Sequence, residues 1–246
     1  MLHEFSKPRQ SAQWRRAAHL TGAGFISRGA TSGPFAPQSE RAGAALGLRC
    51  YTSLAMIRPH ALFCSVCGNA ITRRIPEGDS RERDCCDRCG AVHYLNPRPV
   101  VGTIPVWEDR VLLCKRAIEP RLGFWTLPAG FMEVGETAGE GARRETAEEA
   151  NARITLGPLF TMIDVPSVEQ IHLFYRAQLL DRDFSAGIES LDVRLFLESE
   201  IPWDDLAFRT VSTTLRLFFA DRARGSYGTH TRELPSRPLA GTTGQG

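Results

Sequence analysis

The sequence predicts an α/β protein in which a mixed β-sheet lies between two helices, preceded by a small β-rich module that cysteines hold together. Three observations lead to this prediction. Two Cys-x-x-Cys pairs stand within residues 64–89. Short β-branched and aliphatic runs, separated by turn residues, then follow as far as residue 197, which is the pattern of strands. Residues 138–150 and 210–222 have helical signals instead, and helices on both faces of a sheet make an α/β/α sandwich.

The cysteine pairs indicate a metal site. Four of the seven cysteines form Cys64-x-x-Cys67 and Cys86-x-x-Cys89. Glycine follows the second cysteine of each pair. Such turns point two thiolates inward, and two of them make a tetrahedral Zn²⁺ site. A disulfide framework is the alternative, and it is disfavoured because no signal peptide is recognisable and because adjacent cysteines fit a bridge poorly.

The spacing also separates zinc ligands from their neighbours. Cys86, rather than Cys85, has the ligand spacing from Cys89. With four thiolates available, His93 is expected to be structural. A zinc ribbon of this kind should span about 35 residues and should not fold without its ion. Ribbons occur in enzymes and in nucleic-acid binders, so the ribbon alone does not assign a function.

The region after the ribbon reads as a series of strands. Val100–Val106 and Val111–Arg116 flank a polar turn, which predicts a hairpin. Pro105 indicates an edge or a bulge in the first of these strands, because proline cannot donate to a β-ladder. Further strands are predicted over Ile154–Asp164, Gln170–Leu180 and Val193–Leu197.

The last predicted element is a helix over Thr210–Arg222, in which Val211, Leu215, Phe218 and Phe219 lie along one apolar side. We therefore expect the ribbon over residues 61–96 and an α/β domain over residues 97–224.

The first predicted helix has clear ends. Thr137 and Glu140 have the spacing of a capping box, so the helix should begin near Ala138. Asn151 is a plausible left-handed stop.

The same helix carries three carboxylates on one face. Glu145, Glu148 and Glu149 stand at i, i+3 and i+4, within an arc of about 100°. Carboxylates this close raise each other's pKa unless something positive lies among them. A hard divalent cation, Mg²⁺ or Mn²⁺, shared with a substrate's phosphate oxygens would satisfy them. A solvated acidic face is the alternative, but the preceding glycine turn, the cap and an embedded arginine all favour the metal site.

These residues resemble the Nudix box, G-x5-E-x7-R-E-U-x-E-E-x-G-U, in which U is a bulky aliphatic residue. Six positions match in register: Gly130, Glu136, Arg144, Glu145, Glu148 and Glu149. Thr146, Asn151 and Ala152 depart from the pattern, and none of these three positions holds metal in the family. Asparagine tolerates positive φ well, whereas Thr146 and Ala152 suggest slightly weaker packing of the loop and helix.

The resemblance implies the Nudix sandwich fold and hydrolysis of a nucleoside diphosphate linked to another moiety. It implies that Glu145, Glu148 and Glu149 hold the metal, with help from the Gly130 carbonyl, and that Glu148 and Glu149 act in catalysis. It also implies that Arg144 orients the glutamates.

Many members of the family need another carboxylate from outside the box. We expect Glu189 in this catalytic role, as base or additional ligand, with an ordinary surface charge as the alternative reading.

The resemblance to ribbon-bearing FAD and ADP-ribose pyrophosphatases covers roughly residues 62–222 and suggests the substrate. Arg116 is the expected phosphate contact, and Trp125 is either a stacking surface for adenine or part of the core. NADH-cleaving relatives carry an SQPWPFPxS stretch after the box, and nothing like it follows Ala152. The alternatives are NADH or capped-RNA hydrolysis, or a non-catalytic regulator that senses nucleotides; regulators usually lose the metal-binding glutamates.

Charge and composition limit the partners. The first 60 residues hold eight Lys or Arg and two Glu, so the remainder has 22 basic and 26 acidic residues and offers no basic face for nucleic acid. No apolar window is long enough to span a membrane. The expected partner is a small nucleotide substrate. A homodimer is possible, and the sequence does not decide the oligomeric state.

The two ends are expected to lie outside the folded domains. Residues 1–60 are Ala-, Gly-, Ser- and Arg-rich, which indicates a disordered extension, or translated sequence upstream of the true start. A transit peptide is the alternative. We accordingly expect a cytoplasmic protein, or an organellar one if the extension targets it. Residues 225–246 are expected to be disordered.

Overall fold

The computed structural model describes residues 61–235. The predictions made for residues 1–60 and for residues 236–246 lie outside this part of the chain. Within residues 61–235, none of the helices is long and apolar enough to cross a membrane.

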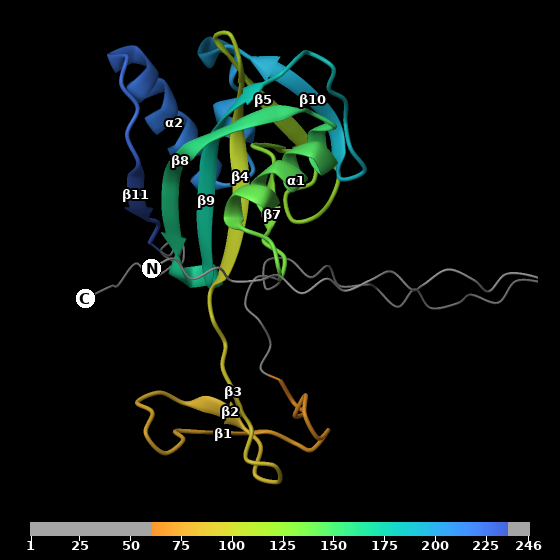
Figure 1. Ribbon diagram of the computed structural model, residues 1–246, viewed down its shortest axis with the longest axis vertical. Coiled ribbons are helices and arrows are strands. Elements are labelled where there is room, and N and C mark those ends of the chain that lie inside the picture. Colours follow the sequence, from red (N-terminus) through yellow and green to blue (C-terminus); the bar gives the residue numbers. More distant parts are fainter. Residues whose placement is uncertain (1–60, 236–246) are drawn as a thin grey trace, which may run out of the picture. The chain divides into compact units, whose positions relative to one another are not determined.

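The cysteine-rich segment forms a small antiparallel sheet (Figure 1). Its strands are β1 (Thr72–Arg74), β2 (Arg83–Cys85) and β3 (Val92–His93). The central strand β2 pairs with both neighbours. The predicted β-rich module is therefore present, with the four cysteines of the two pairs in the turns around the strands.

The following domain is built on an eight-stranded mixed sheet (Figure 1). Its main strands are β4 (Arg98–Trp107), β5 (Arg110–Arg116), β8 (Ile154–Val165), β9 (Gln170–Leu179), β10 (Ser190–Phe196) and β11 (His230–Glu233). They lie in the order β10-β5-β4-β9-β8-β11, and the short strands β6 (Trp125–Thr126) and β7 (Ala129–Phe131) pair with β5 and β4. The β4–β9 and β8–β11 pairs are parallel, and the other pairs are antiparallel.

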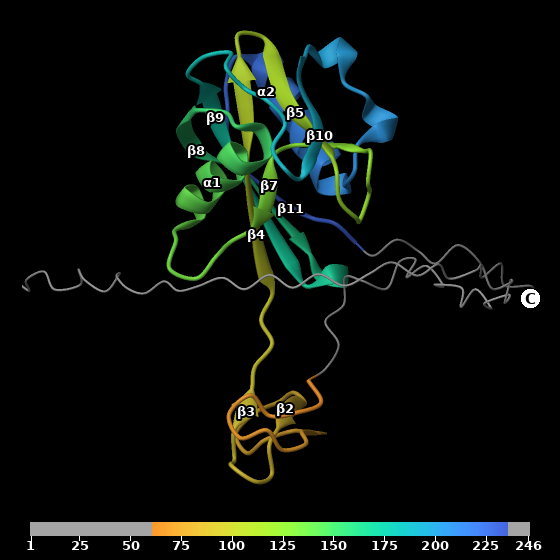
Figure 2. The same ribbon diagram turned by 90° about the vertical axis from the view of Figure 1, so that its right-hand side faces the viewer.

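Two long helices cover opposite faces of this sheet (Figure 2). Helix α1 (Ala138–Ala150) packs on the face of β4 to which Thr103 belongs, because the Thr103 hydroxyl lies 2.7 Å from that of Thr146. Helix α2 (Arg209–Arg224) packs in a core cluster with Ile104, the next residue of β4. Since successive side chains of a strand point to opposite faces, the α/β/α sandwich is confirmed. Short 3-10 helices lie at Pro166–Val168, Glu198–Glu200 and Trp203–Asp205.

The prediction that Pro105 marks an edge or a bulge is wrong, because β4 lies in the middle of the sheet. On one side β4 pairs with β9 over Arg98–Val106, which is all but its last residue. On the other side it pairs with β7 over Val100–Gly102 and with β5 only from Val106 onward. Pro105 falls between these two neighbours, where its missing N–H interrupts no antiparallel ladder.

The prediction of a disordered tail from residue 225 is wrong as far as residue 235. Residues His230–Glu233 form β11, which pairs in parallel with β8 and is itself the edge strand of the sheet. Asp221, fully buried near the end of α2, accepts a hydrogen bond from the Gly228 N–H at 3.0 Å and lies 2.9 Å from the His230 ring. These contacts fix a segment whose composition alone indicates a flexible end.

Candidate active site and zinc site

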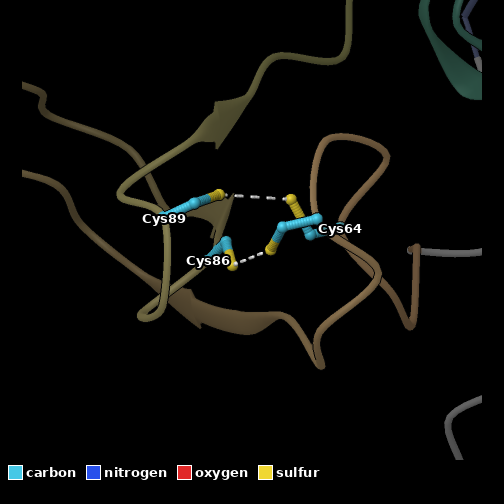
Figure 3. Close-up of side chains that lie close together, drawn as sticks. Cys64, Cys86 and Cys89 are labelled. Atoms are coloured by element: carbon cyan, nitrogen blue, oxygen red, sulfur yellow. Dashed lines mark hydrogen bonds between the residues drawn. The ribbon is translucent and has the colours of Figure 1, made fainter.

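The four predicted zinc ligands lie together in the ribbon. One sulfur atom from each of Cys64, Cys67, Cys86 and Cys89 is within 4.8 Å of the others. Figure 3 shows the side chains of Cys64, Cys86 and Cys89 close together. The sulfur atoms of Cys64 and Cys89 are 3.6 Å apart, and those of Cys67 and Cys86 are 3.4 Å apart. Thiolates spaced in this way match the soft, tetrahedral ligand set that Zn²⁺ prefers.

Cys85 and His93 lie next to the cluster but are not among its four sulfur ligand atoms. The Cys85 sulfur lies outside the cluster, 3.6 Å from the Arg83 carbonyl oxygen. His93 Nε2 lies 3.3 Å from the Cys64 sulfur. A histidine N–H at this distance can support a thiolate ligand from outside the coordination shell.

Replacing Cys67 with serine should remove the zinc and unfold residues 64–93, because a ribbon takes most of its folding energy from its ion. Hydrolysis at a site built from residues 116–189 should persist. Cys85→Ser is the matched control, since this buried thiol lies outside the cluster and its loss should leave one zinc per chain. Elemental analysis and limited proteolysis measure both effects. Zinc content near zero in reduced, metal-supplemented wild-type protein would reject the ribbon.

Helix α1 begins and ends as its sequence predicts. Thr137 accepts a hydrogen bond from the Glu140 N–H at 3.2 Å, and the Glu140 carboxylate accepts one from the Thr137 N–H at 2.8 Å. Asn151 ends the helix with φ 47° and ψ 28°. The Thr146 hydroxyl is fully buried and pairs with Thr103 and with the Ala142 carbonyl oxygen. Thr146 therefore replaces the apolar contact of the family pattern with two buried hydrogen bonds.

Arg144 lies at the centre of the acidic cluster. Its guanidinium donates to Glu136 at 2.8 Å, to Glu145 at 2.7 Å and to Glu148 at 3.1 Å. A further bond reaches the Phe131 carbonyl oxygen at 3.1 Å. The hydrogen bonds from Arg144 lower the pKa of Glu136 to about 2. Arg144 thus ties the loop before α1 to two of the glutamates on its face.

Glu145 lies directly against the backbone at Gly130. A Cβ atom on Gly130 would stand 2.4 Å from the Glu145 carboxylate, which is closer than any real contact allows. Only glycine leaves room for the carboxylate to approach the backbone this closely. Burial raises the pKa of Glu145, and the charges of Glu148 and Glu189 raise it further, against the lowering effect of Arg144.

Glu149 is the most buried of the glutamates on α1, with 5% of its surface exposed. Burial raises its pKa to about 8, and the charges of Glu145 and Glu189 add to this rise. The Ala129 N–H, which donates to Glu149 at 3.2 Å, and the charge of Arg116 act in the opposite direction. A buried carboxylate with so little compensation is suited to binding a cation.

Glu189 comes to the same place from a distant part of the chain. It lies on the exposed loop before β10, and its charge acts on both Glu145 and Glu149. The structure therefore brings together Gly130, Arg144 and the four predicted glutamates around one end of α1.

These residues line one broad cleft of about 2370 Å³. Arg116 also lines it: its Nε donates to the Pro120 carbonyl oxygen at 2.9 Å, and its guanidinium lies 5.2 Å from the Phe208 ring centre. Its charge reaches Glu149. A phosphate bound next to the acidic cluster would therefore lie near the positively charged guanidinium of Arg116.

Trp125 does not line the cleft, so of the two alternatives for this residue the core position is confirmed and the stacking role is wrong. Its side chain is 8% exposed and packs in the core, 4.9 Å from the Phe196 ring in an edge-to-face contact. The preceding residue, Phe124, lines the cleft and lies 5.3 Å below the Arg121 guanidinium. No pattern in the sequence singles out Phe124 or Phe208. The register of β6 decides which of Phe124 and Trp125 faces the opening, and Phe208 reaches the cleft from the start of α2, a distant part of the chain.

Two family models match the chain. The one described as "Nudix N-terminal" covers residues 62–95, and the one described as "NUDIX domain" covers residues 96–207.

Individual relatives agree with these matches. The ADP-ribose pyrophosphatase of Methanocaldococcus jannaschii is 28% identical over 113 residues, which are 44% of this chain and 67% of that protein. The NAD-capped RNA hydrolase NudC of Photobacterium profundum is 32% identical over 92 residues, or 37% of this chain. That match spans only 33% of the length of the NudC relative.

A solved structure matches far more of the chain. A NUDIX hydrolase from Nitrosomonas europaea is 50% identical, with a TM-score of 0.69, and the match covers 71% of this chain and 99% of that one. That match extends over nearly the whole of the other hydrolase, the box residues meet in one cleft, and the ribbon and the α/β domain each match a Nudix family model. The chain therefore belongs to the Nudix hydrolases.

Proposed function

We propose that this enzyme cleaves the phosphoanhydride bond of a nucleoside diphosphate linked to another moiety, and that FAD or ADP-ribose is the preferred substrate. The observation that carries the proposal is the meeting of Glu145, Glu149 and Glu189 at the cleft, where burial and mutual repulsion raise the pKa of the first two. A cluster of carboxylates like this one is suited to phosphoryl chemistry, in which catalysis depends mainly on neutralising negative charge.

The acidic cluster fits Mg²⁺ or Mn²⁺. Glu145, Glu148 and Glu149 would hold the cation, together with the Gly130 carbonyl, because hard divalent ions prefer carboxylate and carbonyl oxygens. When bound, such an ion polarises a phosphoryl oxygen and lowers the pKa of a nearby water.

The protein's own groups would position the reaction. Arg144 fixes the carboxylates of Glu145 and Glu148 by hydrogen bonds, so that they need not rearrange when substrate arrives. Arg116 would bind a phosphate oxygen, since a guanidinium is suited to this contact. A Glu189 carboxylate oxygen would accept the proton of the attacking water. In place of Trp125, Phe124 offers a ring at the cleft for the nucleotide.

The substrate preference rests on the relatives and on a missing feature. The Methanocaldococcus jannaschii relative is named for ADP-ribose. The stretch expected of NADH-cleaving relatives does not follow Ala152. A cleft that binds adenine and two phosphates would distinguish substrates through contacts to the distal moiety.

The test is to measure kcat/KM for FAD, ADP-ribose, NADH and NAD-capped RNA at one metal concentration, with products separated by chromatography. We expect AMP together with FMN or ribose 5-phosphate, and clear preference for FAD or ADP-ribose over NADH. Preference for NADH by more than about tenfold, roughly 1.4 kcal/mol of transition-state binding, would overturn the substrate assignment. No metal-dependent cleavage of any of the four would reject the reaction itself.

A further inference from the structure

The loop between β9 and β10 docks on the C-terminal end of α1. The last carbonyl groups of a helix have no partner within it. Here the Ser185 N–H donates to the Ala150 carbonyl oxygen at 2.9 Å, and the Gly187 N–H donates to that of Glu149 at 3.0 Å. Backbone groups of the loop therefore replace the missing helical partners of two adjacent residues, one of which is a proposed metal ligand.

Asn151 adds a side-chain clamp to this contact. Its Nδ2 amide lies 3.3 Å from the Ser185 carbonyl oxygen, 3.1 Å from the Ser185 hydroxyl and 3.3 Å from the Ala186 carbonyl oxygen. The family pattern has glycine at this position, which would provide the left-handed backbone and nothing more. The amide is therefore not needed to end the helix, and its contacts are all with the loop.

Gly187 allows the loop to approach. A Cβ atom at this position would lie 1.7 Å from the Glu148 carbonyl oxygen and 3.2 Å from the carbonyl carbon of Glu149. Both atoms belong to the backbone of α1 and cannot move away as a side chain could. Any residue larger than glycine would therefore push the loop off the helix.

Glu189 follows two residues later and is fixed on both sides. The Ser190 N–H donates to the Gly187 carbonyl oxygen at 3.1 Å, which closes a turn around Glu189. The Ala117 N–H, just beyond β5, donates to the Glu189 carbonyl oxygen at 2.8 Å. The backbone of Glu189 thus has one anchor on α1, through Gly187, and one at the end of β5.

We infer that Asn151 and Gly187 are positioning residues, which hold the loop on α1 so that Glu189 faces the metal-binding glutamates. The inference rests on the proposed function, in which Glu189 takes part in hydrolysis. Neither residue needs to touch the substrate. Groups that orient catalytic residues in this way typically change activity by about 10- to 100-fold when they are lost.

The experiment is a double-mutant cycle that combines Asn151→Gly with Glu189→Gln. Glycine keeps the left-handed helix end, so the variant should fold and melt close to wild type. We expect Asn151→Gly to lower kcat about tenfold, with KM changing less than about twofold. In the Glu189→Gln background the same change should cost almost nothing, because the group being positioned is already gone. Equal losses in both backgrounds would show that Asn151 does not act through Glu189.

Hydrogen exchange of the metal-free protein provides a readout independent of activity. The Ser185 and Gly187 amides should exchange faster in Asn151→Gly than in wild type, while the α1 amides keep their protection. Unchanged exchange of these two amides in Asn151→Gly would show that Asn151 does not hold the loop on α1. Gly187→Ala is the second variant and should reproduce the kinetic effect. Thr214→Val is the control. It removes a buried contact of 3.0 Å between the hydroxyls of Thr214 on α2 and Thr161 on β8, and it should lower stability without lowering kcat.

The experimental outcomes distinguish a failure of the positioning role from a failure of the proposed hydrolytic function. Full activity of Glu189→Gln, in an enzyme that still hydrolyses its substrate, would overturn the positioning role and leave the proposed reaction standing. Wild-type protein that cleaves no substrate would reject the function and the positioning role with it, and the exchange data would then report on the clamp alone.

Discussion

Replacing Glu149 with glutamine is expected to lower turnover by about a thousandfold or more while leaving the fold intact, because a ligand charge facing the metal is lost without a change in shape. Glu149 is 5% exposed and has the Ala129 N–H at 3.2 Å. The glutamine carbonyl oxygen can still accept that bond, so the backbone of the Gly130 loop should stay in place. Steady-state hydrolysis at saturating Mg²⁺ measures the effect, and activity within about tenfold of wild type would remove Glu149 from the site.

Melting curves of the same variant test the electrostatic reason. Burial raises the pKa of Glu149 to about 8 in the fold, above an unfolded value of about 4.3. The stability associated with its bound proton is therefore fully present below the unfolded pKa and is lost as the pH rises through the folded pKa. Glutamine cannot lose this proton. In EDTA at pH 7 to 8 the variant should melt at or above the wild-type temperature, and Mg²⁺ should raise the melting temperature of wild type far more than that of the variant.

Replacing Gly130 with alanine is expected to lower turnover by about a hundredfold, through displacement of Glu145. The new methyl group would stand 2.4 Å from the Glu145 carboxylate, so either the carboxylate or the loop must move. A shift of about 1 Å in a catalytic group is enough for an effect of this size. Titration with Mn²⁺ should show weaker metal binding in the variant, and unchanged binding would contradict the displacement.

Gly228→Ala is the matched control for this substitution. A Cβ atom at Gly228 meets nothing within 4 Å, and its N–H still donates to Asp221. Neither Gly130 nor Gly228 has a positive φ. The two variants therefore differ in crowding and not in backbone strain, and only Gly130→Ala should lose activity.

Local patterns of the sequence determined much of the structure. The capping box at Thr137, the left-handed stop at Asn151 and the hairpin around Glu108 depend on contacts within a few residues. The four ligand cysteines are likewise selected by spacing inside each short turn. The three α1 glutamates share a face because a helix repeats every 3.6 residues. Such features can be read from the chain because the groups that make them are close along it.

Other features depend on which distant segments pair, and these only the tertiary structure decided. Phe124 faces the cleft and Trp125 the core because the register of β6 turns these neighbours in opposite directions. Pro105 is tolerated in a central strand because two different strands share that side of β4. The parallel addition of β11 orders residues that by composition resemble a tail.

The active site shows the same division. The sequence by itself determined the acidic face of α1, the arginine within it and the glycine before it, because one loop and one helix carry them all. The position of Glu189 could only be suggested, since the loop that carries it is held by Asn151 and Gly187 through contacts with the end of α1. Those contacts join residues 34 and 35 positions apart in the chain, so their geometry is a property of the folded domain and not of any one segment.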